Sequence, residues 1–126
     1  MIKIALALMP PAAALAFLVS AESGSARNVP ARPPAFAICA ACHTVEPGQT
    51  SFGPNLRGLG GRRAASLPGY AYSPALKASG LTWDRATLDA WLTSPQKKVP
   101  GTKMPFAGLP DPEKRKQIID YLMSLK

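Results

Sequence analysis

Both cysteines of this chain and its single histidine lie in one short run, Cys39-Ala40-Ala41-Cys42-His43. A Cys-x-x-Cys-His run is the attachment signature of a c-type haem. Two thiols bond covalently to the vinyl groups of the porphyrin, and the adjacent imidazole binds the iron as its proximal ligand. On a helical turn, residues three apart share a face, so both sulfur atoms would meet one edge of a flat macrocycle. The motif therefore predicts one covalently attached haem c.

Three other interpretations of the motif are disfavoured by what surrounds it. A structural zinc site needs four ligands, and the chain has no second cysteine pair and no second histidine. A thioredoxin-like dithiol lies at a strand-to-helix turn, but no strand-like alternation occurs between residues 30 and 60. A plain disulfide would close a tiny loop, contribute little stability and leave His43 without a role.

The opposite face of the iron needs a second ligand or must stay open, and methionines are the candidates for that ligand. Met1 and Met9 fall in a segment that we predict to be removed, which leaves Met104 and Met123. Met123 lies on the apolar face of the predicted last helix, where a core role is expected. Met104 lies in a loop rich in proline and glycine, where a methionine is unusual as a mere space-filler. This favours Met104 as the ligand.

The N-terminus predicts export. Residues 1–21 carry one lysine, then a largely apolar stretch, then small residues at a cleavage site. An uncleaved membrane anchor is the alternative, because about 18 apolar residues could just span a bilayer. Residues 22–33 are rich in alanine and proline and predict a flexible leader. Residues 34–126 then form one domain, whose modest apolar content a large buried cofactor would supplement.

The first half of the domain predicts one short helix and a long irregular segment. The helix would begin at Pro33-Pro34, with its prolines in the first turn, and run into the haem motif. Phe36 and Ile38 are its expected core contacts. From Glu46 to about Gly69 no apolar period is sustained, so this stretch is expected to wrap a cofactor or form an Ω-loop.

The second half predicts more helix and no strand. One or two turns are expected over residues 73–79, and a longer helix over Asp84 to Thr93, ended by Ser94-Pro95. Asp111-Pro112-Glu113 is a strong helix start, because it supplies a capping acceptor, a proline at the first position and an acid in the first turn. Apolar residues recur at helical spacing after it. The sequence thus predicts an all-α fold of three to five helices with long loops.

The charge balance restricts the partners. The formal net charge is +8 for the whole chain and +7 after removal of Lys3 with the predicted signal. An exported basic protein with no interleaving of aromatic and basic residues indicates an acidic protein partner or an anionic membrane surface. Nucleic acid is not expected outside the cell membrane.

Several motifs follow one another in the order that a known family shows. They are Cys39-Ala-Ala-Cys-His-Thr-Val-Glu-Pro-Gly, Gly53-Pro-Asn-Leu-Arg-Gly, Pro68-Gly-Tyr-Ala-Tyr-Ser, Gly80-Leu-Thr-Trp and Pro100-Gly-Thr-Lys-Met-Pro-Phe-Ala-Gly-Leu. The chain resembles a class I cytochrome c, of the group of mitochondrial cytochrome c and bacterial cytochrome c2. The resemblance covers residues 34–126, and it implies the small cytochrome c fold wrapped around a covalently bound haem.

The resemblance assigns the haem attachment and the ligands. It implies that Cys39 and Cys42 form the thioethers and that His43 and Met104 are the axial ligands. It also implies that the carbonyl of Pro54 accepts a hydrogen bond from Nδ1–H of His43, which orients the ring and tunes its basicity.

Other residues are implied to surround the haem. Tyr72 and Trp83 would hydrogen-bond a propionate, Arg62 would balance buried carboxylate charge, and Phe106 would flank the exposed haem edge. Without the resemblance, Tyr72 and Trp83 would be taken as amphipathic core residues.

The chain departs from the family pattern at three places. Trp91 stands where the family has a tyrosine near the methionine sulfur, and an indole donates differently. Leu76 replaces a polar residue in the network around an internal water. Pro33 and Pro34 shorten the first helix and displace the glycine at its crossing with the last helix. We keep Trp91 among the predicted cofactor contacts.

The expected function is electron transfer rather than catalysis. A haem with histidine and methionine ligands has no vacant site for a substrate, so one-electron exchange is the expected activity. The protein is expected to be a soluble, monomeric, periplasmic carrier. It would take electrons from a bc1-type complex or dehydrogenase and pass them to a terminal oxidase or similar acceptor. Lys97, Lys98 and Lys103, with Lys77 nearby, would steer the acidic redox partners. The alternatives are a small peroxidase-like haem enzyme, which needs distal acid–base groups, and a membrane-anchored electron-transfer subunit.

Overall fold

The computed structural model describes residues 31–126, so the predicted export signal and most of the predicted leader lie outside the described residues. The helical elements are η1 (Pro34–Phe36), α1 (Ala37–Ala40), α2 (Pro74–Ala78), α3 (Arg85–Thr93), α4 (Pro95–Lys98) and α5 (Pro112–Ser124). Within residues 31–126 the only β interaction is an isolated bridge between Arg63 and Thr82. The all-α prediction is therefore confirmed.

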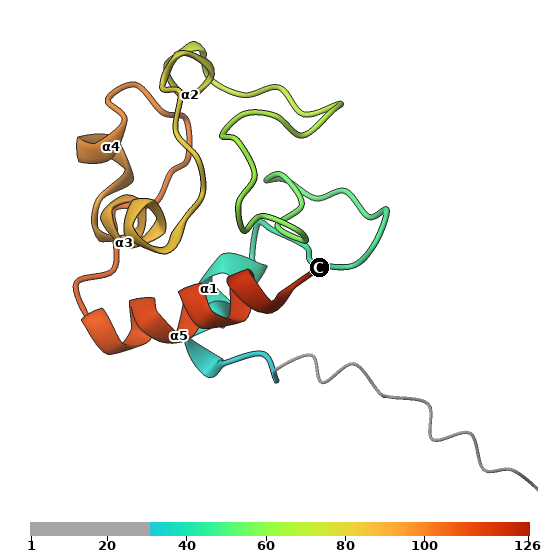
Figure 1. Ribbon diagram of the computed structural model, residues 1–126, viewed down its shortest axis with the longest axis vertical. Coiled ribbons are helices and arrows are strands. Elements are labelled where there is room, and N and C mark those ends of the chain that lie inside the picture. Colours follow the sequence, from blue (N-terminus) through green and yellow to red (C-terminus); the bar gives the residue numbers. More distant parts are fainter. Residues whose placement is uncertain (1–30) are drawn as a thin grey trace, which may run out of the picture.

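The N-terminal helical segment packs on α5 through an aromatic pair. The ring of Phe36 is fully buried and meets Tyr121 edge-on, with 5.0 Å between the ring centroids. Helix η1 contacts α5, and Figure 1 shows this N-terminal helical segment crossing α5. Ile38 was expected in the core, but its side chain is 54% exposed and lines the cavity described below. Residues two positions apart in an α-helix are separated by about 200° around its axis, so Ile38 and Phe36 face different sides.

Helix α3 forms as its sequence predicts. The side chain of Asp84 caps it by accepting from the backbone N–H of Thr87 at 2.7 Å, and its apolar stripe of Leu88, Trp91 and Leu92 is buried. Helix α4 follows it directly and was not predicted. Ser94 is extended there (φ −163°, ψ 97°) and redirects the chain, so that the next proline begins a new turn.

Helix α5 begins at the predicted cap. The carboxylate of Asp111 accepts from the backbone N–H groups of Glu113 and Lys114. Its buried face packs against α3 and η1. Met123 is partly buried against this core, as predicted, and lies beside Gly60.

Residues 41–73, between α1 and α2, form no helix, as expected, and consist of turns and irregular chain. In Figure 1 this green segment lies opposite α3 and α4, with α1 and α5 along one end. Residues of this segment and of α1, α3 and α5 line the cavity described below. Across the described part of the chain, no helix combines the length and the apolar character needed to cross a bilayer.

Candidate functional site

A cavity of about 510 Å³ occupies the middle of the domain, well inside the range of about 300–1,000 Å³ that cofactor sites show. Its wall is predominantly apolar. All ten residues predicted to contact the cofactor line it: Cys39, Cys42, His43, Pro54, Arg62, Tyr72, Trp83, Trp91, Met104 and Phe106. They come from α1, α3 and three loops, so the fold gathers groups that are far apart in the sequence.

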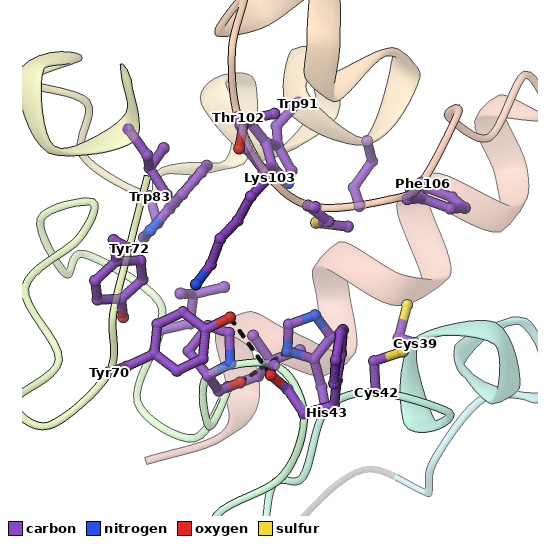
Figure 2. A pocket seen from close by; sticks show the side chains of 18 of the residues that line it. Cys39, Cys42, His43, Tyr70, Tyr72, Trp83, Trp91, Thr102, Lys103 and Phe106 are labelled. Atoms are coloured by element: carbon purple, nitrogen blue, oxygen red, sulfur yellow. Dashed lines mark hydrogen bonds between the residues drawn. The ribbon is translucent and has the colours of Figure 1, made fainter. Parts of the chain in front are cut away.

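Cys39 and Cys42 are both free thiols at one wall of the cavity. The turn between them is helical, because the backbone N–H groups of Cys42 and His43 both donate to the carbonyl of Cys39, at 3.1 and 2.9 Å. Figure 2 shows the two sulfur-bearing side chains on the same side of His43. Burial raises the pKa of the Cys39 thiol to about 11. An apolar wall of this kind suits neutral thioethers better than thiolates.

His43 is prepared to act as a neutral nitrogen ligand. Its Nδ1 lies 2.7 Å from the carbonyl oxygen of Pro54. A carbonyl only accepts, so Nδ1 carries the proton and Nε2 keeps its lone pair. Burial lowers the pKa of His43, and the Pro54 hydrogen bond opposes this effect in part. The ring is therefore neutral near pH 7, in the tautomer that leaves Nε2 free.

Gly53 is a site residue to which the sequence analysis gave no separate role. A Cβ atom there would lie 2.6 Å from Cε1 and 2.7 Å from Nδ1 of His43. Its own N–H donates to the carbonyl of Cys42 at 2.6 Å. Only a residue without a side chain lets this loop press on the imidazole. The Gly-Pro dipeptide after the haem motif is the signal that could have indicated it.

Met104 lines the same cavity and is half-buried. The loop that carries it is held at its start, where Thr102 is buried and its carbonyl accepts from Nε2 of Gln96 at 2.8 Å. The N–H of Phe106 donates to the carbonyl of Met104 at 2.9 Å, which closes a tight turn at Pro105, directly after the methionine. The thioether is thus presented by a loop with fixed ends.

The polar part of the wall is formed by Arg62, Tyr72 and Trp83. The guanidinium of Arg62 donates to the carbonyls of Asn55 and Arg57, at 3.1 and 3.2 Å, and forms no ion pair with any carboxylate of residues 31–126. Burial raises the pKa of Tyr72, and the positive charge of Arg62 opposes that shift. This positive wall suits a ligand that carries carboxylates.

The residues that depart from the family pattern give an apolar wall. Trp91 is buried and its ring meets Trp83 edge-on, with centroids 5.2 Å apart. Leu76 is buried and also lines the cavity. Trp91 and Leu76 therefore place bulky apolar groups in the cavity wall.

The predicted docking lysines are not all alike. Lys103 lines the cavity, and its ammonium group binds the carbonyl of Ala71 and lies 4.6 Å from the ring centroid of Tyr70. Figure 2 shows Lys103 reaching from the Met104 loop toward Tyr70. Lys97 and Lys98 lie on α4, are exposed, and do not line the cavity. No sequence pattern indicates the Lys103–Tyr70 pair, because the two residues are far apart in the chain.

The donor set fits a c-type haem. Two adjacent thiols, an imidazole with a free nitrogen, a thioether and a cationic wall face one cavity. No alternative metal cluster competes, since the described residues hold no group of three or more His, Cys, Asp or Glu side chains suited to a metal ion.

The comparisons with known proteins agree with this chemistry. A family model described as Cytochrome c matches residues 35–126. A cytochrome c2 of Rhodoblastus acidophilus is 52% identical over 92 residues, which are 72% of this chain and 86% of that protein. Cytochrome c2 iso-2 of Magnetospirillum molischianum is 46% identical over 94 residues, or 75% and 97% of the two chains.

A solved structure, cytochrome cH from Methylobacterium extorquens, superposes with a TM-score of 0.66 at 55% identity and covers 70% of this chain and 89% of its own. The motif, the cavity and these relatives support one another. The chain belongs to the cytochrome c family, as a class I cytochrome c of the cytochrome c2 group with one covalently bound haem c.

Proposed function

We propose that this electron-carrying cytochrome is a soluble, monomeric, periplasmic shuttle. It would take single electrons from a bc1-type complex or a dehydrogenase and deliver them to a terminal oxidase or a similar acceptor. The observation that carries the proposal is that His43 and Met104 line one cavity, the first with its Nε2 lone pair free. These two residues would hold both axial positions, so no position remains for a substrate.

The bound haem supplies reversible one-electron exchange between Fe(II) and Fe(III). The chain provides the surroundings that set its potential. Leu88, Leu92, Ile118 and Leu122 line the cavity and exclude water from it. A neutral thioether and an apolar wall both favour the less charged, reduced centre, so a high potential is expected.

Export and partner choice rest on separate observations. The predicted signal at residues 1–21 supports the periplasm, although it lies outside the described residues. The relatives named cytochrome c2 and cytochrome cH support an electron carrier. The docking surface would be basic and formed by Lys97, Lys98 and Lys103, of which the first two project freely from α4.

The electronic spectrum of the oxidised protein tests the ligand pair. A sulfur-to-iron charge-transfer band is expected in the parent, and it should be absent in Met104→Leu. Met123→Leu is the matched control, because Met123 lies outside the cavity lining and its exchange leaves the iron untouched. A colourless parent protein, or a Met104→Leu variant with an unchanged spectrum, would refute the proposal.

A further inference from the structure

The Met104 loop comprises residues 99–111, between α4 and α5. One side chain from α5 holds the C-terminal end of this loop. Nη1 of Arg115 donates to the carbonyl oxygens of Leu109 and Pro110, at 2.9 and 2.8 Å. Its Nε donates to Oδ1 of Asp89, on α3, at 2.7 Å. One guanidinium therefore joins the end of the loop to two helices. In Figure 1 the orange segment after α4 runs past α3 to the start of α5, where these groups meet.

The arrangement around Arg115 is well fixed. Its side chain is only 11% exposed, in contrast to the other ion-paired cations of the described residues, which are more than half exposed. A guanidinium is planar, and its fork can hold several acceptors at once in a set geometry. The carboxylate of Asp89 orients that fork, so the two carbonyls are offered donors in fixed positions.

The C-terminal end of the Met104 loop is packed tightly against the end of α3. The N–H of Leu109 donates to the carbonyl of Leu92 at 2.8 Å. Gly108 has φ +121°, and a Cβ atom there would collide with the carbonyl of Thr93. The chain thus reverses against the last turn of α3 immediately before the two carbonyls that Arg115 binds.

We propose that Arg115 is a positioning residue for Met104, a role that rests on the proposed ligation of iron by Met104. Four residues separate Met104 from Leu109, and Gln96 holds the other end of the loop through Thr102. With both ends fixed, the loop has few alternative conformations. Releasing the Arg115 end allows the thioether to leave the cavity at a lower cost in free energy, while the haem attachment at α1 is unaffected.

Imidazole is the probe for this freedom, because it competes with the thioether for the iron. Its binding to the oxidised holoprotein is followed by loss of the charge-transfer band at constant pH and well below the unfolding temperature. Arg115→Met loses the hydrogen bonds from a charged donor to both carbonyls, so it should bind imidazole at least about tenfold more tightly than the parent. Asp89→Asn, which keeps the bonds to both carbonyls, should show a smaller increase.

The matched control is Arg85→Met. Arg85 also joins α3 to α5, through Asp120 at 2.6 Å, but it is exposed, and within residues 31–126 its side chain makes no hydrogen bond to the Met104 loop. Arg85→Met removes the same charge as Arg115→Met, and its imidazole affinity should stay within about twofold of that of the parent. If Arg115→Met does not yield folded holoprotein, Arg115→Lys takes its place, since an ammonium cannot reproduce the fork.

Failure of the proposed Met104 ligation can be distinguished from failure of the positioning role of Arg115. If Met104→Leu leaves the spectrum of the oxidised protein unchanged, the proposed ligation is wrong and the role of Arg115 is lost with it. If Met104→Leu abolishes the band but Arg115→Met or Arg115→Lys binds imidazole as weakly as Arg85→Met does, the ligation stands and the positioning role of Arg115 is refuted.

Discussion

Replacing Gly53 by alanine would place a methyl group against the imidazole of His43, the proposed iron ligand. The Cβ atom would lie 2.6 Å from Cε1 and 2.7 Å from Nδ1 of His43. Carbon atoms pack best at about 3.5–4.0 Å, so the ring or the loop must move by about 1 Å. The loop cannot easily retreat, because Gly53 donates to Cys42 at 2.6 Å and the carbonyl of Pro54 binds Nδ1 at 2.7 Å.

The expected cost follows from these contacts. Overpacking a filled site costs about 1–3 kcal/mol, and losing the Pro54 hydrogen bond adds about 0.5–1.5 kcal/mol. Gly53→Ala should therefore lower the free energy of unfolding by about 2–4 kcal/mol, as measured by urea titration of the holoprotein. The reduction potential should rise, because an imidazole with a weaker Nδ1–H bond donates less electron density to Fe(III).

Gly60→Ala is the matched control for this substitution. Its Cβ would lie 2.9 Å from Sδ of Met123, the far end of a flexible side chain that does not line the cavity. That thioether can move aside, so stability should fall by less than about 1 kcal/mol and the potential should be unchanged. Equal changes in stability and in potential for Gly53→Ala and Gly60→Ala would refute the steric role of Gly53 beside His43.

Two further predictions concern the exposed charges. Hydrogen bonds from the backbone N–H and the hydroxyl of Thr87 hold the pKa of Asp84 below its usual value. Its charged form thus stabilises the fold above about pH 4, the unfolded value, and this contribution is lost as pH falls through the folded pKa. Asp84→Asn keeps a capping acceptor but does not titrate. Its loss of unfolding free energy relative to the parent should therefore shrink on acidification. A loss that is independent of pH would contradict a stabilising role for the Asp84 charge. Replacing Lys97 and Lys98 by glutamate should slow electron transfer to an acidic partner about tenfold at low salt and flatten the salt dependence in stopped-flow measurements. Lys126→Glu, which makes half of that charge change away from α4, is the control; an effect half as large on a logarithmic scale would indicate net charge rather than a docking site.

Local patterns were sufficient for several elements of this fold. The start of α5 was predicted because Asp111 and Pro112 act on their own first turn. The stripe on α3 was predicted because its buried residues recur within a few positions of one another. Helix α4 was missed because its four residues have no apolar period, and the redirection at Ser94 decides that it forms.

By itself, the sequence determined the chemistry of the site. Two thiols and an imidazole adjacent in one helical turn can be identified from their spacing. Met104 is predicted as the second ligand because it lies in a loop rich in proline and glycine, whereas Met123 lies on an apolar helix face. Tertiary structure alone decided how these groups are held. Contacts such as Gly53 against His43 and Arg115 against Leu109 join segments that come together only when the chain folds around the cavity. The exposure of Ile38 has the same origin, because packing of Phe36 against Tyr121 sets the rotation of the first helix.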